Sequence, residues 1–95
     1  MFCFLARAIF EPGNPETDAR LLSSLCTKIE KRFKVTCRLQ KDRFPDQPTI
    51  VFTGLGPTSQ RSSETIDGIF GFCENHGLGR VTEDVVFLDD IEDCT

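Results

Sequence analysis

The spacing of apolar residues in the first third of the chain predicts a strand followed by a helix. Residues 2–10 are rich in phenylalanine and aliphatic side chains, and a Pro-Gly pair follows them, which is typical of a strand that ends in a turn. Apolar residues then recur at intervals of three and four, after an Asn14-Pro15 start that suits the first turn of a helix. We therefore expect a helix over residues 15–32.

The rest of the chain predicts three further strands and a second helix. One segment alternates between apolar and polar residues, which indicates a half-buried strand. Later segments are a short apolar run, a second apolar stripe at helical spacing and a final apolar run. The expected strands cover residues 33–40, 49–53 and 84–91 or part of it, and the helix starts near Ser62 or Ser63 and ends before Gly77.

The predicted order β-α-β-β-α-β favours a ferredoxin-like α+β domain. Right-handed crossovers in this plan give a four-stranded antiparallel sheet in the order 4-1-3-2 with both helices on one face. Ninety-five residues suit one domain, which we expect to span residues 1–95 with an acidic C-terminal tail from about residue 89. The other face of the sheet is then predicted to be open.

Arg7 indicates which face of the first strand should pack against the helices. The odd-numbered residues include Arg7, whereas the even-numbered ones are three phenylalanines and two alanines. Burial of an unpaired guanidinium is costly, so the even-numbered residues should lie under the helices. Arg7, Leu5 and Ile9 should then lie on the open face. The same argument places Lys34 and Arg38 on the open face of the second strand.

The last predicted strand suggests that a partner covers the open face. Val85, Val86, Phe87 and Leu88 follow one another, and strands that are apolar on both sides are usually covered on both sides. In so small a domain the second cover would be another copy of the chain or another protein. The alternative is that these side chains are simply exposed, as scattered apolar residues often are.

Composition favours a cytoplasmic protein without a membrane segment. No apolar run approaches the ~20 residues of a spanning helix. The apolar N-terminus lacks a basic start and contains an arginine, unlike a signal peptide. The cysteines have no C-x-x-C spacing, so we expect Cys3, Cys26, Cys37 and Cys73 to be small core residues and Cys94 to be exposed in the tail.

Charge is distributed unevenly, although the net charge of −4 does not favour nucleic acid. Residues 28–43 hold seven basic and two acidic residues, and residues 83–93 hold six acidic and no basic ones. Such a contrast can mark an interaction face, and it is also common on solvated surfaces. An RNA- or ribosome-associated protein would use basic side chains near the first segment to contact phosphates. The candidates are Arg7, Lys34, Arg38, Lys41 and Arg43.

The segment before the second helix is a candidate for binding a small anion. Gly54 to Gln60 is predicted to be a loop, and glycines, hydroxyl groups and a helix N-terminus together can hold a phosphate. The spacing matches no phosphate-loop motif, so a plain loop with capping serines is the alternative. The residues that would bind the anion are Gly54, Gly56, Ser62 and Ser63.

No motif for catalysis, metal or cofactor binding stands out. The cysteines lack iron–sulfur spacing, the acidic C-terminal residues lack EF-hand spacing, and no nucleophile–base pair can be named. RNA-recognition motifs need aromatic residues on the open face, whereas Phe2 and Phe4 are expected to face the helices, and a shift of one residue would reverse this. We expect no catalytic residue, no metal and no cofactor.

In its order of features the chain resembles the YlxP-like family of small bacterial proteins. The resemblance rests on Pro12-Gly13, a helix ending Glu30-Lys-Arg-Phe-Lys-Val35 and a helix ending Phe72-Cys-Glu-Asn-His76, over about residues 2–90. A Lys/Arg-rich helix start and a tryptophan between strands two and three, both usual in that family, are missing here. The resemblance implies a ferredoxin-like fold, no established activity and a hint of a ribosomal role.

The sequence therefore supports three functional hypotheses. The first is a non-enzymatic interaction module, expected to be a homodimer that uses the open sheet face or the last strand. The second is an RNA- or ribosome-associated protein that uses the basic residues. The third is a small-anion binder or enzyme at the glycine- and serine-containing segment.

Overall fold

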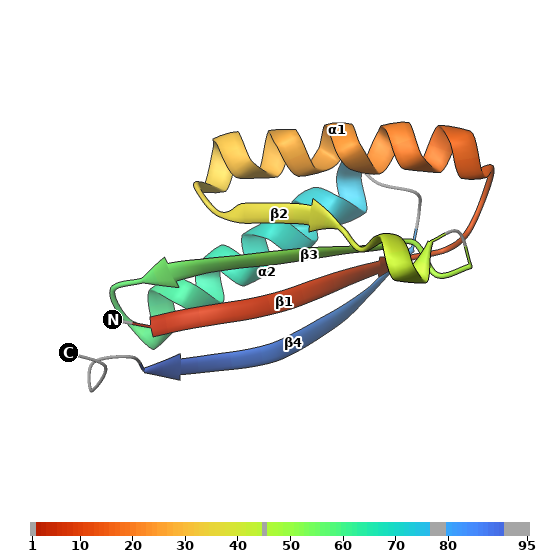
Figure 1. Cartoon of the computed structure of the whole chain (residues 1–95). Coiled ribbons are helices and arrows are strands. Elements are labelled where there is room, and N and C mark those ends of the chain that lie inside the picture. Colours follow the sequence, from red (N-terminus) through yellow and green to blue (C-terminus); the bar gives the residue numbers. More distant parts are fainter. Residues whose placement is uncertain (1, 45, 77–79, 91–95) are drawn as a thin grey trace.

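The computed structural model describes residues 2–44, 46–76 and 80–90. In chain order the elements are β1 (Phe2–Phe10), α1 (Pro15–Phe33), β2 (Thr36–Leu39), the short 3₁₀ helix η1 (Lys41–Arg43), β3 (Thr49–Gly56), α2 (Ser59–His76) and β4 (Val81–Asp90). The strands pair antiparallel in the order β2-β3-β1-β4, which reads β4-β1-β3-β2 from the other edge (Figure 1). The prediction of an α+β fold with four antiparallel strands and two helices is confirmed.

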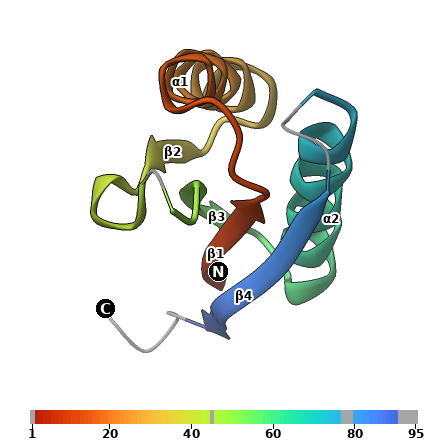
Figure 2. The same cartoon turned by 90° about the vertical axis from the view of Figure 1, so that its right-hand side faces the viewer.

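Both helices cover the same face of the sheet. Helix α1 packs over β2, and α2 packs against β1 and β4 (Figure 2). The core fills the space between the helices and the sheet, and Phe52 of β3 meets Phe70 of α2 edge to face at 5.4 Å between ring centroids. The opposite face of the sheet carries no helix in the part of the chain that the structure describes.

Strand β1 turns its even-numbered side chains toward the helices, as predicted. The buried residues of this strand are Phe4, Ala6, Ala8 and Phe10. The side chains between them, including that of Arg7, are only partly covered. The expected cost of burying an unpaired charge therefore predicted the facing of this strand correctly.

Helix α1 begins at the predicted residue and ends one residue later than expected. The side chain of Asn14 accepts hydrogen bonds from the backbone N–H groups of Glu16 and Thr17, at 3.1 and 3.2 Å. This cap satisfies N–H groups that have no partner within the helix. At the other end Phe33 is still helical, and Lys34 ends the helix in the left-handed region at φ 57°.

Strand β2 is therefore shorter than predicted. It covers Thr36–Leu39 rather than residues 33–40, because the last turn of α1 and its left-handed cap occupy residues 33 and 34. The alternation continues across this boundary since Phe33 and Val35 both contact the core, the first from the helix and the second from the connection. The prediction that Lys34 projects from a strand on the open face is wrong.

A buried carboxylate closes the turn before α1. Asp18 is almost fully buried, and its Oδ2 accepts a hydrogen bond from the backbone N–H of Gly13 at 2.8 Å. We expect Asp18→Ala to lower the free energy of unfolding by about 2 kcal/mol, because the Gly13 N–H loses a charged partner. Asp18→Asn keeps an acceptor oxygen and should cost about half as much. Urea unfolding of both variants measures this, and equal losses would contradict the importance of the hydrogen bond.

Strand β3 is longer, and α2 begins earlier, than the sequence predicts. Gly54 and Gly56 continue the strand instead of forming a loop, because β1 pairs with this segment as far as Phe2 opposite Gly56. Helix α2 begins directly after Thr58, whose hydroxyl oxygen accepts the backbone N–H of Arg61 at 3.1 Å. Two residues separate the strand from the helix, so the predicted loop is largely absent.

Strand β4 begins at Val81, before the predicted start at Asp84, and pairs with β1. The register between the two strands shifts between Leu5 and Ala6 of β1, which is typical of a β-bulge. Some predictions fall outside the described residues: Gly77 after the second helix, Ile91 in the last strand, the exposed Cys94, and the acidic tail beyond residue 90.

Candidate interaction surface

The uncovered face of the sheet is apolar mainly along its two central strands. The odd-numbered residues of β1 and β3 lie on it in pairs: Cys3 with Leu55, Leu5 with Thr53, and Arg7 with Val51. The row ends with Ile9 opposite Thr49, which is fully buried. Leu5, Ile9 and Val51 are half-buried, and Leu55 is 60% exposed. Leu5 and Ile9 are thus on the open face, as predicted, and Val51 and Leu55 of β3 extend the apolar surface. The outer strands bring polar residues to the same face, namely Thr36 of β2 and Thr82 and Asp84 of β4.

The positive charge at the centre of this face is neutralised within the sheet. Nε of Arg7 donates a hydrogen bond to Oδ2 of Asp84 on β4 at 2.8 Å, and its Nη2 contacts the same oxygen. The two side chains are 26% and 36% exposed, so the ion pair is partly shielded from water. Arg7 lies on the predicted face, but it adds little net charge there.

Strand β4 forms one edge of the sheet and exposes apolar side chains. Within the described ranges it pairs with β1 and with no other strand. Val85 and Val86 lie beside the register shift and are 49% and 48% exposed. A free edge also offers unpaired backbone groups, which makes it a template for pairing with another chain.

Arg38 does not join Arg7 on the open face, although the backbone register places it in the same row, opposite Val51. It belongs to an edge strand, and its long side chain reaches back to α1. Its Nη1 donates to both carboxylate oxygens of Glu30, each at 3.0 Å. The predicted position of Arg38 on the strand is right, but the prediction that its charge lies on the open face is wrong.

The remaining basic candidates lie on other elements. Lys34 caps α1, and Lys41 and Arg43 belong to η1. Lys34 and Lys41 are exposed, and Arg43 donates a hydrogen bond to the side chain of Gln47 at 3.1 Å. The five predicted residues are therefore spread over four parts of the fold, and two of them are already paired with carboxylates.

The four candidates for anion binding do not lie on one loop. Gly54 and Gly56 belong to β3, and Ser62 and Ser63 belong to α2. Ser62 is fully buried against Gly56: a Cβ atom at residue 56 would lie 2.1 Å from the Ser62 Oγ. This contact leaves no room for a phosphate between the glycine and the serine hydroxyl.

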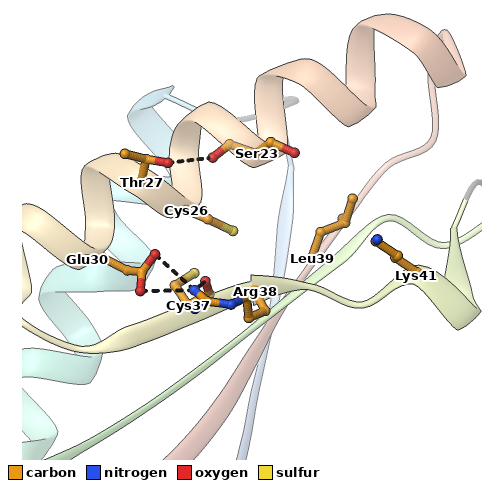
Figure 3. A pocket seen from close by; sticks show the side chains of 8 residues that line it. All are labelled: Ser23, Cys26, Thr27, Glu30, Cys37, Arg38, Leu39 and Lys41. Carbon is orange, nitrogen blue, oxygen red and sulfur yellow. Dashed lines mark hydrogen bonds and ion pairs between the residues drawn. The ribbon is translucent and has the colours of Figure 1, made fainter.

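Three of the cysteines are buried, as predicted, and two of them come together in a pairing that was not predicted. Cys26, Cys37 and Cys73 are core residues, and burial raises the pKa of Cys73 to about 12. Cys3 is only half-buried, because it belongs to the odd-numbered side of β1. Cys26 of α1 and Cys37 of β2 line the same cavity (Figure 3). The signal was available, since both occupy inward positions of elements that are adjacent in the chain.

No protein-family model matches this chain, and no curated protein matches its sequence. Within the described ranges, no helix is long and apolar enough to cross a membrane. The same ranges hold no group of three or more His, Cys, Asp or Glu side chains arranged to bind a metal ion. The interpretation of the open face and of β4 therefore rests on their own residues.

Proposed function

We propose that the chain is a non-enzymatic interaction module that forms a homodimer through the open face of its sheet together with strand β4. One observation carries the proposal: a sheet face, uncovered by any helix in the described part of the chain, that is apolar along β1 and β3 and whose central arginine is already paired with Asp84. Faces of this kind on small domains commonly meet another protein surface.

The area of the face explains why the proposal includes β4. Four strands about 4.8 Å apart and about eight residues long present roughly 500 Å². A standard stable interface buries about 800 Å² on each partner. Val86, at the register shift, adds exposed apolar area at the edge strand, whereas Val85 lies opposite Ala6 on the helix side of the sheet. The face therefore needs the edge of β4 to approach the required size.

The polar groups on this face are compatible with burial. Taking a lone guanidinium out of water costs several kcal/mol, whereas a paired one keeps its partner. Arg7 has Asp84, and the hydroxyl of Thr53 donates a hydrogen bond to the backbone oxygen of Phe4 at 2.6 Å. These groups would enter an interface with partners already in place.

Leu55→Asp tests the proposed interface. The substitution is expected to raise the dissociation constant of the dimer about 10-fold, because a carboxylate would replace an apolar contact worth about 1.4 kcal/mol or more. Leu55 lies next to the end of β3 and is already exposed, so the monomer should stay folded. Sedimentation of the full chain over a dilution series measures the constant.

Ser24→Asp is the matched control, because it adds the same charge at an exposed position of α1, away from the open face. It should leave the dissociation constant unchanged. If the wild-type chain is monomeric at every concentration, or if both substitutions weaken the dimer equally, the open face is not the interface.

An RNA- or ribosome-associated role is the weaker proposal. Phosphate would have to displace the carboxylates that already pair with Arg7 and Arg38. Lys34 and Lys41 are exposed and free of that cost, but Lys34 lies at the end of α1 and Lys41 lies in η1, rather than on the open face. Ion pairs within the fold therefore already account for two of the basic residues, Arg7 and Arg38.

Three finer points belong to the same proposal. The β-α-β-β-α-β order with both helices on one face supports a ferredoxin-like assignment. Buried cysteines at ordinary core positions support a cytoplasmic location. Membership of the YlxP-like family stays a prediction.

A further inference from the structure

Two thiols from different elements meet at one edge of the sheet. Cys26 projects from α1 and Cys37 from β2, and Figure 3 shows both side chains in the gap between helix and strand. Cys26 keeps 6% of its surface exposed and Cys37 keeps 0%. The two cysteines are therefore packed as a pair, with Cys26 the more accessible member.

A small cavity with a mainly apolar surface gives access to this pair. It has a volume of about 260 Å³ and is lined by Ser23, Cys26, Thr27, Glu30, Cys37, Arg38, Leu39 and Lys41. Because a water molecule occupies about 30 Å³ in the liquid, a cavity of this size admits small hydrophilic molecules. Hydrogen peroxide is only slightly larger than water, so it can reach the sulfur of Cys26.

The surroundings make the two thiols chemically unequal. The neighbouring thiol of Cys37 lowers the pKa of Cys26, an effect that Arg38 supports and that burial and Glu30 oppose. The interaction with Cys26, together with burial, raises the pKa of Cys37. Because the thiolate is the reactive form of cysteine, Cys26 is suited to react with peroxide before Cys37 does.

We propose that Cys26 and Cys37 form a redox-active dithiol that hydrogen peroxide converts to a disulfide joining α1 to β2. In the first step the Cys26 thiolate attacks one peroxide oxygen, the O–O bond breaks, and the released hydroxide takes up a proton to form water. In the second step the Cys37 sulfur attacks the Cys26 sulfenic acid, its thiol proton is lost, and a second water leaves. The dithiol loses two electrons and two protons, and one peroxide is reduced to two waters.

The accessibility of the pair differs from that of the other thiols. Cys73 of α2 lies near enough to Cys26 for charge on Cys26 to raise its pKa, but it is fully buried and lies outside the cavity lining. Burial is the main cause that raises the pKa of Cys73 to about 12. Cys3 lies on the opposite, open face of the sheet. Oxidation should therefore join Cys26 to Cys37 rather than to either of these residues.

Peptide mapping of the reduced full chain after treatment with equimolar hydrogen peroxide tests the proposal. Remaining thiols are alkylated after unfolding, and the peptides are separated without reductant. A peptide pair linked through Cys26 and Cys37, lighter by two hydrogens, is the expected main product. If both cysteines are recovered alkylated while another thiol is oxidised, or if Cys26 is linked to Cys73, the proposal is overturned.

Three variants assign the roles of the thiols. Cys37→Ser keeps a hydrogen-bonding group beside Cys26 and should leave Cys26 as a sulfenic acid that dimedone labels, whereas Cys26→Ala should leave Cys37 reduced. Cys73→Ala removes an equally buried thiol and should form the linked product at the wild-type rate. If a variant fails to fold, the wild-type peptide map still decides whether the pair is joined, since it requires no substitution.

Discussion

Gly56→Ala is expected to lower the free energy of unfolding by about 3 kcal/mol, the upper end of the usual cost of overpacking a core. The added Cβ would lie 2.1 Å from the Oγ of Ser62 and 3.2 Å from its Cβ, so the first turn of α2 would have to move away from β3. Ser62 has no exposed surface into which it could turn. Urea or thermal unfolding of the purified variant measures the loss.

The double variant Gly56→Ala/Ser62→Ala should recover most of that stability. Among the described residues the Ser62 hydroxyl is buried without a hydrogen-bond partner, so its removal sacrifices no bond and relieves the closest contact. The coupling between the two substitutions, obtained from a double-mutant cycle, should be about 2 kcal/mol. A coupling near zero would mean that an alanine side chain at residue 56 is accommodated by a movement that does not involve the Ser62 hydroxyl, which would contradict the proposed clash.

Gly71→Ala is the matched control for a glycine substitution. A Cβ at residue 71 meets nothing within 4 Å, and the residue lies inside α2. Alanine there should stabilise the protein by up to about 1 kcal/mol, because glycine is the poorer helix former. Opposite signs at Gly56 and Gly71 would show that space, and not glycine content, decides the outcome.

The type and order of the elements could be predicted from the sequence, whereas several boundaries could not. Apolar residues that alternate or form short runs mark buried strands, and apolar residues spaced three and four apart mark the buried side of a helix. These patterns predicted both helices and the four strands of the described chain. The pattern does not report where one element ends if the next also buries its first residues, as with Phe33 and Val35. Gly54 and Gly56 carry a loop signal, but pairing with β1 keeps them in β3.

For the candidate surface, the sequence predicted which face of the sheet a residue lies on, but not which partner its side chain contacts. The cost of burying a lone guanidinium placed Arg7 on the open face correctly. Its partner Asp84 depends on the register of β4, which a bulge shifts and which no local pattern specifies. Arg38 shows the same limit. Alternation along a strand predicts the face from which a side chain leaves the backbone. It does not predict that the long side chain of Arg38, on an edge strand, turns back to contact Glu30.

Asp84→Ala is expected to weaken the proposed homodimer about 100-fold. The substitution leaves Arg7 without its carboxylate, and an unpaired guanidinium confined by a second sheet face costs about 3 kcal/mol or more. In the separated monomer Arg7 can turn toward water, so stability should fall by about 1 kcal/mol at most. Sedimentation at several dilutions gives the dissociation constant, and urea unfolding of the dilute protein gives the monomer's stability.

Removal of both charges separates a general disturbance of β4 from the effect of an unpaired cation. Arg7→Leu/Asp84→Leu should dimerise as tightly as the wild type or more tightly, since apolar replacements for a shielded ion pair are often neutral or stabilising. If Asp84→Ala leaves the dimer unchanged, Arg7 is not enclosed by a second copy. If that variant instead gains salt-sensitive retention on RNA, the freed guanidinium contacts phosphate, and the open face is better explained as a nucleic-acid surface that Asp84 holds in check.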